Sequence, residues 1–145
     1  MAFNSPRSFE LVIPSRLEAL ESVQRLVTEA AQEYKLSEDI AYWMELSISE
    51  SMINAIRHGN RCDPSKNAHL RISMNGSKLE IIVEDQGNGF SLDSLADPTE
   101  SQNLLKPSGR GILIIRSFMD EVNLSVSEGG GSRLRMVKRL PESNT

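Results

Sequence analysis

The sequence predicts an α+β fold in which a mixed, mainly antiparallel sheet is covered by helices on one face. Two observations support this class. The patterns follow the order strand, two helices, hairpin, long irregular segment, short helix and second hairpin, and turn signals at Asn75-Gly76 and at 128–131 join strands directly. The 145 residues, 39% of them hydrophobic and 25% charged, suit a single compact domain. We expect this domain to span residues 8–140, with flexible tails at 1–7 and 141–145.

Strands are predicted where apolar residues alternate with polar ones. The first covers residues 8–13. Asn75-Gly76 is a typical hairpin turn between the next two strands, and the glycine run at 129–131 turns the chain between the last two. The alternating residues are Phe9, Leu11 and Ile13; Leu70, Ile72 and Met74; Leu79, Ile81 and Val83; Val122, Leu124 and Val126; and Ser132, Leu134 and Met136.

Three helices are predicted from apolar residues at helical spacing. They cover about 15–34, 38–58 and 111–119. Ser15 and Ser37 precede the first two and are expected to act as N-caps. The core-facing stripes are Leu20, Val23, Val27 and Ala31 in the first helix, and Ile40, Met44, Ile48, Met52, Ala55 and Ile56 in the second.

Composition and charge exclude several classes of protein. Sixteen basic against twenty acidic residues give a net charge of −4, which argues against a main role in binding nucleic acid. No apolar run approaches the roughly 20 residues of a membrane-spanning helix. The single cysteine, Cys62, can form no internal disulfide, so we expect a cytoplasmic protein with an incidental thiol.

The segment Asp85-Gln-Gly-Asn-Gly89 follows a predicted strand directly. Asp85 shares its parity with Leu79, Ile81 and Val83, so its carboxylate should point toward the buried side. A buried carboxylate needs hydrogen-bond donors, and the amino group of adenine is one such donor. The alternative is an ordinary turn whose acidic side chain is solvated.

The segment Ser108-Gly-Arg-Gly111 leads into the third helix, after an irregular stretch from 86 to 110. So long an irregular stretch is typical of a functional lid or a disordered loop. Amides at a helix N-terminus, preceded by glycines, can bind phosphate, and Lys106 and Arg110 add positive charge. The alternative is a flexible linker.

Glu50 and Asn54 lie one turn apart on the second helix, on a face roughly opposite Ile48. Periodicity alone predicts an ordinary solvated face. If a pocket covers this face, Asn54 could reach a metal ion and Glu50 could accept a proton.

Together the three segments resemble the GHKL ATPase superfamily with its Bergerat two-layer fold. The similarity is closest to its branch of anti-sigma factor serine/threonine kinases. Residues 48–59 resemble the family's N box, residues 83–90 its first glycine box, and residues 106–112 with 117–122 its second. The resemblance spans residues 8–140.

The resemblance implies roles for single residues. Asp85 would bind the adenine amino group, Gly87 and Gly89 would shape the base pocket, and Ser132 would help to hold adenine through water. Glu50 would be the general base, and Asn54 would coordinate Mg²⁺ on the ATP phosphates. The phosphate-binding set would be Lys106, Gly109, Arg110 and Gly111.

The function implied is that of an anti-sigma factor that uses Mg·ATP to phosphorylate an anti-anti-sigma protein of the STAS type. It would also sequester a sigma factor and form a homodimer. Arg25 resembles a partner-contacting arginine, although a solvated basic residue is the simpler interpretation.

Three alternatives stay open at this stage. The first is a nucleotide-dependent binding module without phosphotransfer. The second is the catalytic domain of a sensor kinase, which would carry an upstream helical segment with a phosphorylatable histidine that residues 1–7 do not supply. The third is a fragment of a gyrase-type or chaperone-type ATPase.

Overall fold

The computed structural model describes residues 8–87 and 107–141, and for 107–112 it describes the backbone only. Gly89, Lys106, most of the predicted lid and both predicted tails, apart from Pro141, therefore lie outside the described residues. The side chain of Arg110 lies outside them too.

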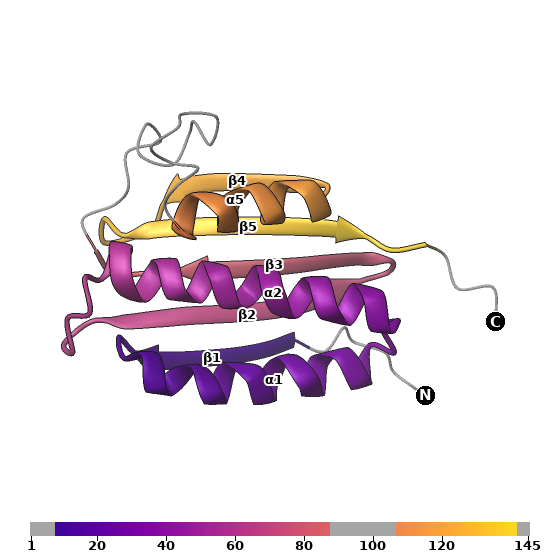
Figure 1. The fold of residues 1–145 in the computed structure, drawn as a ribbon, viewed down its shortest axis with the longest axis horizontal. Helices are drawn as coiled ribbons and strands as arrows, with labels where there is room; N and C mark the ends of the chain where they lie inside the picture. The colour runs from indigo at the N-terminus through magenta and orange to yellow at the C-terminus, as the bar shows by residue number, and fades with distance from the viewer. Residues whose placement is uncertain (1–7, 88–106, 142–145) are drawn as a thin grey trace.

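One antiparallel sheet forms the first layer of the molecule (Figure 1). Its strand order is β1-β2-β3-β5-β4, and all four pairings of these strands are antiparallel. Gly76, at the β2–β3 turn, has φ +64°, and Gly129 and Gly130 have φ +92° and +97°, which explains glycine at these turns. The strands are β1 (Ser8–Pro14), β2 (Asn67–Asn75), β3 (Lys78–Glu84), β4 (Glu121–Val126) and β5 (Ser132–Arg139).

Helices form the second layer and lie on one face of this sheet (Figure 1). A short 3₁₀ turn, η1 (Leu17–Ala19), leads into α1 (Leu20–Glu33). The long helix α2 (Glu38–Asn54) continues into a π-helical turn, η2 (Ala55–Gly59), and α5 (Pro107–Phe118) packs beside α2. The predicted α+β class and its one-sided cover of helices are confirmed.

The core lies between the two layers, where the apolar stripes of the helices meet one face of the sheet. Alternation in β2, β3 and β5 places every second side chain in this core. The fully buried larger side chains are Val23, Met44, Ile48, Met52, Ile56, Leu70, Ile72, Leu79, Ile81, Ile115, Met136 and Val137. All but Val137 belong to the core cluster, and within the described residues no helix is long and apolar enough to cross a membrane.

Two of the sequence predictions about where helices begin are wrong. The Ser37 hydroxyl accepts a hydrogen bond from the Ile40 amide at 3.2 Å, so this N-cap is confirmed. The predicted cap at Ser15 is wrong, because its hydroxyl instead donates to the Lys66 carbonyl at 2.7 Å. The third helix begins at Pro107, four residues earlier than Gly111, where the sequence placed its start.

Candidate nucleotide-binding site

Asp85 follows β3 directly and is buried, with 5% of its surface exposed. The inward direction predicted from strand parity is therefore confirmed. Its Oδ1 accepts hydrogen bonds from the amides of Gly87 and Ser132, each at 3.0 Å. Among the described residues, no hydrogen bond reaches Oδ2. One oxygen of this carboxylate is thus held by the backbone, and the other has no hydrogen-bond donor within the described residues.

Three glycines bring backbone close to Asp85. A Cβ on Gly59 would overlap Oδ2 of Asp85, and a Cβ on Gly131 would overlap the Asp85 carbonyl. A Cβ on Gly87 would overlap the Gly59 carbonyl. The end of η2, the residues after β3 and the start of β5 therefore meet at van der Waals distance, and only glycine fits at these contacts.

Asn54 is the last residue of α2 and is 8% exposed. The solvated exterior predicted from periodicity is therefore wrong for this residue. Periodicity records only the apolar stripe, whereas Asn54 lies where the helix changes to the π-helical turn and approaches the sheet. Within the described residues its side-chain amide makes no hydrogen bond. Among the described residues only Ser47 Oγ is a fully buried side-chain polar atom without a partner, so the amide of Asn54 keeps some access to solvent. An accessible amide that makes no bond within the described residues is suited to a ligand or a metal ion.

Glu50 lies one turn before Asn54 and is partly buried. Burial raises the pKa of its carboxyl above the ordinary 4.5, because desolvation disfavours the charged form. A carboxylate with a raised pKa is a better proton acceptor near neutral pH.

Asn60, which directly follows η2, connects three segments beneath the site. Its Nδ2 donates to the Ser15 hydroxyl at 2.8 Å and to the Asn67 carbonyl at 2.9 Å, and its Oδ1 accepts from the Gln86 amide at 2.7 Å. With 1% exposure it is buried. It thereby fixes the chain that runs between Asp85 and Gly87. No local pattern signals this role, because its partners are distant in sequence.

We expect Asn60→Ala to lower the free energy of unfolding by about 2–4 kcal/mol, because it leaves several buried polar groups without partners. Urea unfolding measures this loss. Asn123→Ala, at an exposed position of β4, is the control and should change stability by less than about 0.5 kcal/mol. Equal losses for the two variants would contradict the structural role of Asn60.

Gly59→Ala should weaken nucleotide binding at least about tenfold, because the new methyl group displaces the Asp85 carboxylate. Calorimetric titration with Mg·ATP measures the affinity. Gly129→Ala is the control: its backbone is strained at φ +92°, but its Cβ meets nothing within 4 Å. It should lose stability and keep its affinity for ATP. Unchanged affinity in Gly59→Ala would contradict the proximity of Gly59 to a bound base.

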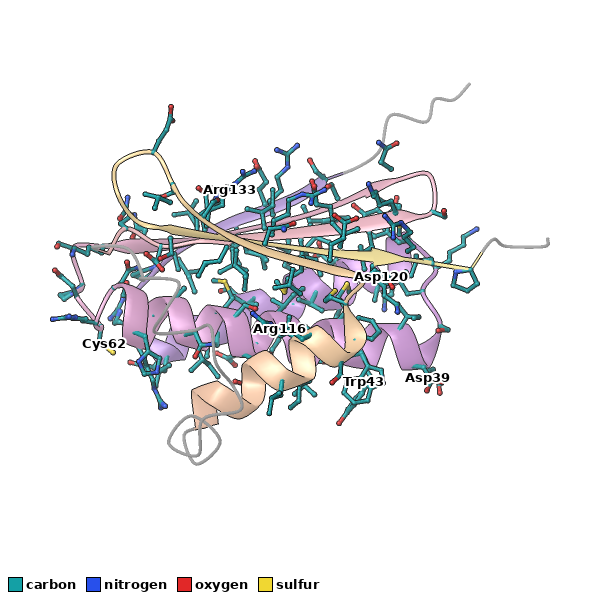
Figure 2. The ribbon with its side chains drawn as sticks, turned by 90° about the horizontal axis from the view of Figure 1, so that it is seen from above. Asp39, Trp43, Cys62, Arg116, Asp120 and Arg133 are labelled. Carbon is teal, nitrogen blue, oxygen red and sulfur yellow. The ribbon has the colours of Figure 1, made fainter. Side chains whose placement is uncertain are left out.

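Helix α5 runs antiparallel to α2 (Figure 2). Trp43, near the start of α2, stacks on Phe118 at the end of α5 with ring centroids 6.1 Å apart. The first turn of α5 therefore lies toward the end of α2 that carries Asn54. Gly109 and Arg110 belong to this first turn, and Gly111 follows as the fifth residue of the helix, so all three lie inside the helix and not ahead of it.

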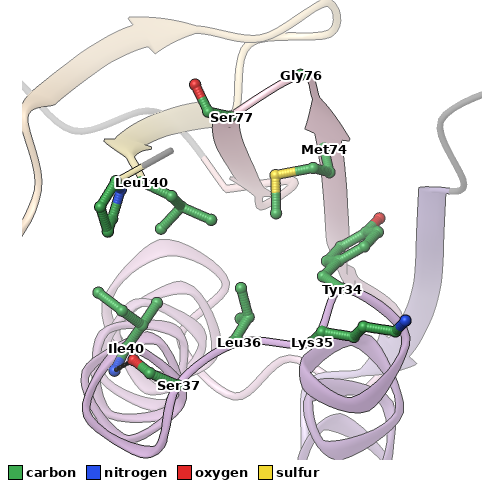
Figure 3. Close-up of a pocket in the computed structure, with 10 residues that line it drawn as sticks. Tyr34, Lys35, Leu36, Ser37, Ile40, Met74, Gly76, Ser77 and Leu140 are labelled. Atoms are coloured by element: carbon green, nitrogen blue, oxygen red, sulfur yellow. Dashed lines mark hydrogen bonds between the residues drawn. The ribbon is translucent and has the colours of Figure 1, made fainter. Parts of the chain in front are cut away.

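The structure thus brings Asp85, Gly87 and Ser132 into one cluster beside Gly59. Glu50 and Asn54 lie on the helix that ends at this cluster. A cavity of about 380 Å³ lies at the opposite end of α2, between its first turn and the β2–β3 turn (Figure 3). It is lined mainly by apolar side chains, among them Leu36, Ile40 and Met74, and none of the predicted site residues lines it.

The structure combines a layer of helices on an antiparallel sheet with a buried aspartate after a central strand and glycines around it. The chain belongs to the histidine kinase-like ATPase domain family, whose model matches residues 13–138.

The chain is similar to the anti-sigma F factor of Bacillus cytotoxicus, with 31% identity over 99 residues that cover 67% of this chain and 68% of that protein. It is 24% identical over 143 residues to the serine-protein kinase RsbW of Bacillus subtilis. This match covers 94% of this chain and 88% of that protein. The mycobacterial sensor histidine kinase MprB has the same fold, with a TM-score of 0.56 over 92% of this chain and 99% of that chain, at 12% identity.

Proposed function

We propose that the chain is an anti-sigma factor with serine/threonine protein kinase activity. It uses Mg·ATP to phosphorylate an anti-anti-sigma protein of the STAS type, and it sequesters a sigma factor. Relatives that are named anti-sigma F factor and serine-protein kinase support this function. In this proposal residues 8–140 form one domain, which acts in the cytoplasm as a homodimer.

One observation carries the nucleotide-binding part of the proposal. Two polar side chains are buried at one end of the helix–sheet layer, and each keeps capacity for a ligand. Oδ2 of Asp85 can accept a hydrogen bond from the adenine amino group, while the amide of Asn54 can offer its oxygen to Mg²⁺. Oxygen is the ligand that Mg²⁺ prefers, so the donor set fits this ion.

The base pocket in this proposal is formed by backbone and small residues. Asp85 binds the adenine amino group, Gly87 and Gly89 let the flat base approach the backbone, and Ser132 supports the base from the start of β5. The amides of Gly87 and Ser132 hold the Asp85 carboxylate in place before ATP binds. Such preorganisation favours affinity because little order is lost on binding.

The phosphates extend from this pocket toward α5. Asn54 would hold Mg²⁺, and the bound ion would supply positive charge to the triphosphate. The first turn of α5 supplies the backbone amide of Gly109, and the positive end of the helix dipole favours the phosphates. Gly111 lies past the free amides of the helix start, so in this proposal it is a neighbour of the phosphates and not an amide donor. In this proposal Lys106 and Arg110 complete the phosphate-binding set with their positive charge, and Arg110 is the one assigned to the γ-phosphate.

Glu50 is the general base in this proposal. It takes the proton of an acceptor serine or threonine hydroxyl while that oxygen forms a bond to the γ-phosphorus. The bond between the γ-phosphorus and the β–γ bridging oxygen breaks, and ADP leaves with its electron pair. The protein contributes mainly by positioning and by charge stabilisation.

Transfer of labelled phosphate tests the kinase proposal. The full chain is incubated with Mg²⁺, γ-labelled ATP and each STAS-domain protein from the genome that supplies the chain. We expect one of them to be labelled on serine or threonine. If the chain binds ATP and a sigma factor but labels none, it is a nucleotide-dependent binding module without phosphotransfer.

A further inference from the structure

The outward side of α2 carries four apolar or aromatic side chains together with two carboxylates. We call the outer α2 face the set Asp39, Tyr42, Trp43, Leu46, Glu50 and Ile53. Tyr42 is 60% exposed and Trp43 is 38% exposed. Leu46 and Ile53 are partly exposed, and within the described residues neither is part of the core cluster or packed against it. Exposed tyrosine and tryptophan side chains are typical anchors of protein–protein contacts.

The charge of α2 is of one sign. Between Glu38 and Asn54 the helix carries four acidic residues and no basic one. Glu38, Asp39 and Glu45 are exposed and lie beside the two aromatic side chains. A partner that docks here therefore gains from lysine or arginine side chains and is repelled if it is acidic.

The outer α2 face is continuous with the proposed general base. Leu46 follows Tyr42 by four residues, and Glu50 follows Leu46 by four, so the three side chains form one row on the helix. Trp43 precedes Glu50 by seven residues and lies on the same side. At 1.5 Å per residue, the aromatic pair lies about 11 Å from Glu50 along the helix.

We propose that the outer α2 face docks the phosphate-acceptor protein, an inference that rests on the kinase function proposed above. The acceptor places an apolar side chain against Tyr42, Trp43 and Leu46, and basic side chains beside the acidic residues of the first two turns of α2. Its hydroxyl lies about 11 Å from this apolar anchor, within reach of Glu50. Docking on α2 thus selects the acceptor before the hydroxyl approaches the γ-phosphate.

Steady-state phosphotransfer kinetics test this docking surface. The acceptor is the STAS-domain protein that the wild-type chain phosphorylates. Tyr42→Ala should raise the KM for the acceptor about tenfold and leave kcat at saturating acceptor nearly unchanged, because it removes binding that is equal in the ground and transition states. Asp39→Lys should raise the same KM several-fold, and added salt should reduce this difference.

Val12→Ala is the matched control, since Val12 is a 58% exposed apolar residue on β1, away from α2. It should leave the KM for the acceptor unchanged, and all three variants should keep the wild-type affinity for ATP. Within the described residues the one ring contact of Tyr42 is an edge contact with Trp43 at 5.4 Å, so its removal should not unfold the chain, which circular dichroism verifies.

An unchanged acceptor KM in both Tyr42→Ala and Asp39→Lys would overturn the docking surface while leaving the kinase function intact. The docking surface for the acceptor would also be overturned if Tyr42→Ala weakened the binding of a sigma factor and left the acceptor KM unchanged. If the wild type labels no STAS-domain protein, the kinase function fails, and this inference fails with it.

Discussion

Asp85→Asn should weaken ATP binding at least about 100-fold while the protein stays folded. The substituted side chain keeps an oxygen that can accept from the amides of Gly87 and Ser132, so the local backbone is preserved. In place of Oδ2 it carries an NH₂ group, which would face the amino group of adenine. Two donors that face each other in a buried site lose a hydrogen bond and leave polar groups unsatisfied.

Calorimetric titration with Mg·ATP measures this effect, and thermal unfolding without nucleotide verifies the fold. Asp39→Asn is the matched control, because it makes the same change at an exposed position. Asp39 lies in the first turn of α2, whereas the proposed ATP site lies at the end of that helix. It should bind ATP like the wild type. Tight ATP binding by Asp85→Asn would contradict the base pocket described above.

Glu50→Ala should lower kcat for phosphotransfer by a factor of about 10² to 10⁴ and leave the affinity for ATP almost unchanged. The reason is that Glu50 acts on the proton of the acceptor and not on the nucleotide. Glu45→Ala, an exposed acidic residue on the same helix, is the control for kcat and should retain the wild-type value. If Glu50→Ala had the same kcat as the wild type, Glu50 would not be the general base, and another group would accept the proton.

The pH dependence of kcat/KM provides a further prediction for Glu50. Because burial raises its pKa above 4.5, the acidic limb of the profile should lie at a higher pH than an exposed glutamate would give. This limb should be absent from the residual activity of Glu50→Gln. A limb that persists unchanged in this variant would belong to a different group.

The same pKa shift links Glu50 to stability. A carboxyl whose folded-state pKa is raised contributes stability below its unfolded pKa, and this contribution is lost as the pH rises through the folded pKa. Glu50→Gln should therefore be more stable than the wild type at neutral pH, with a smaller difference near pH 4. Urea unfolding at several pH values measures this trend, and a gain that does not grow with pH would contradict it.

Local patterns predicted the elements and the direction of two site residues. Parity along β3 and β5 placed both Asp85 and Ser132 on the buried side, because alternation is a property of each strand alone. The N-cap at Ser37 and the turn at Gly76 were likewise predicted from residues that are neighbours along the chain. These features depend on interactions over a few residues, which the sequence displays directly.

Features that depend on distant partners could not be predicted in this way. The pairing of β3 with β5 joins strands about fifty residues apart, and it is this pairing that brings the Ser132 amide to Asp85. The burial of Asn54, the π-helical turn after it and the bonds of Asn60 also depend on packing between elements. Ser15 was misassigned because its partner, the Lys66 carbonyl, is equally remote.

The central claim is that one ATP molecule is bound at both ends by this cluster: its base at Asp85 and its phosphates beside Asn54 and the start of α5. A crystal structure of the full chain with Mg²⁺ and a non-hydrolysable ATP analogue tests it most directly. We expect the adenine amino group within hydrogen-bonding distance of Oδ2 of Asp85, and Mg²⁺ on the side-chain oxygen of Asn54. An analogue bound elsewhere, for example in the apolar cavity beside Ile40 and Met74, would contradict the account.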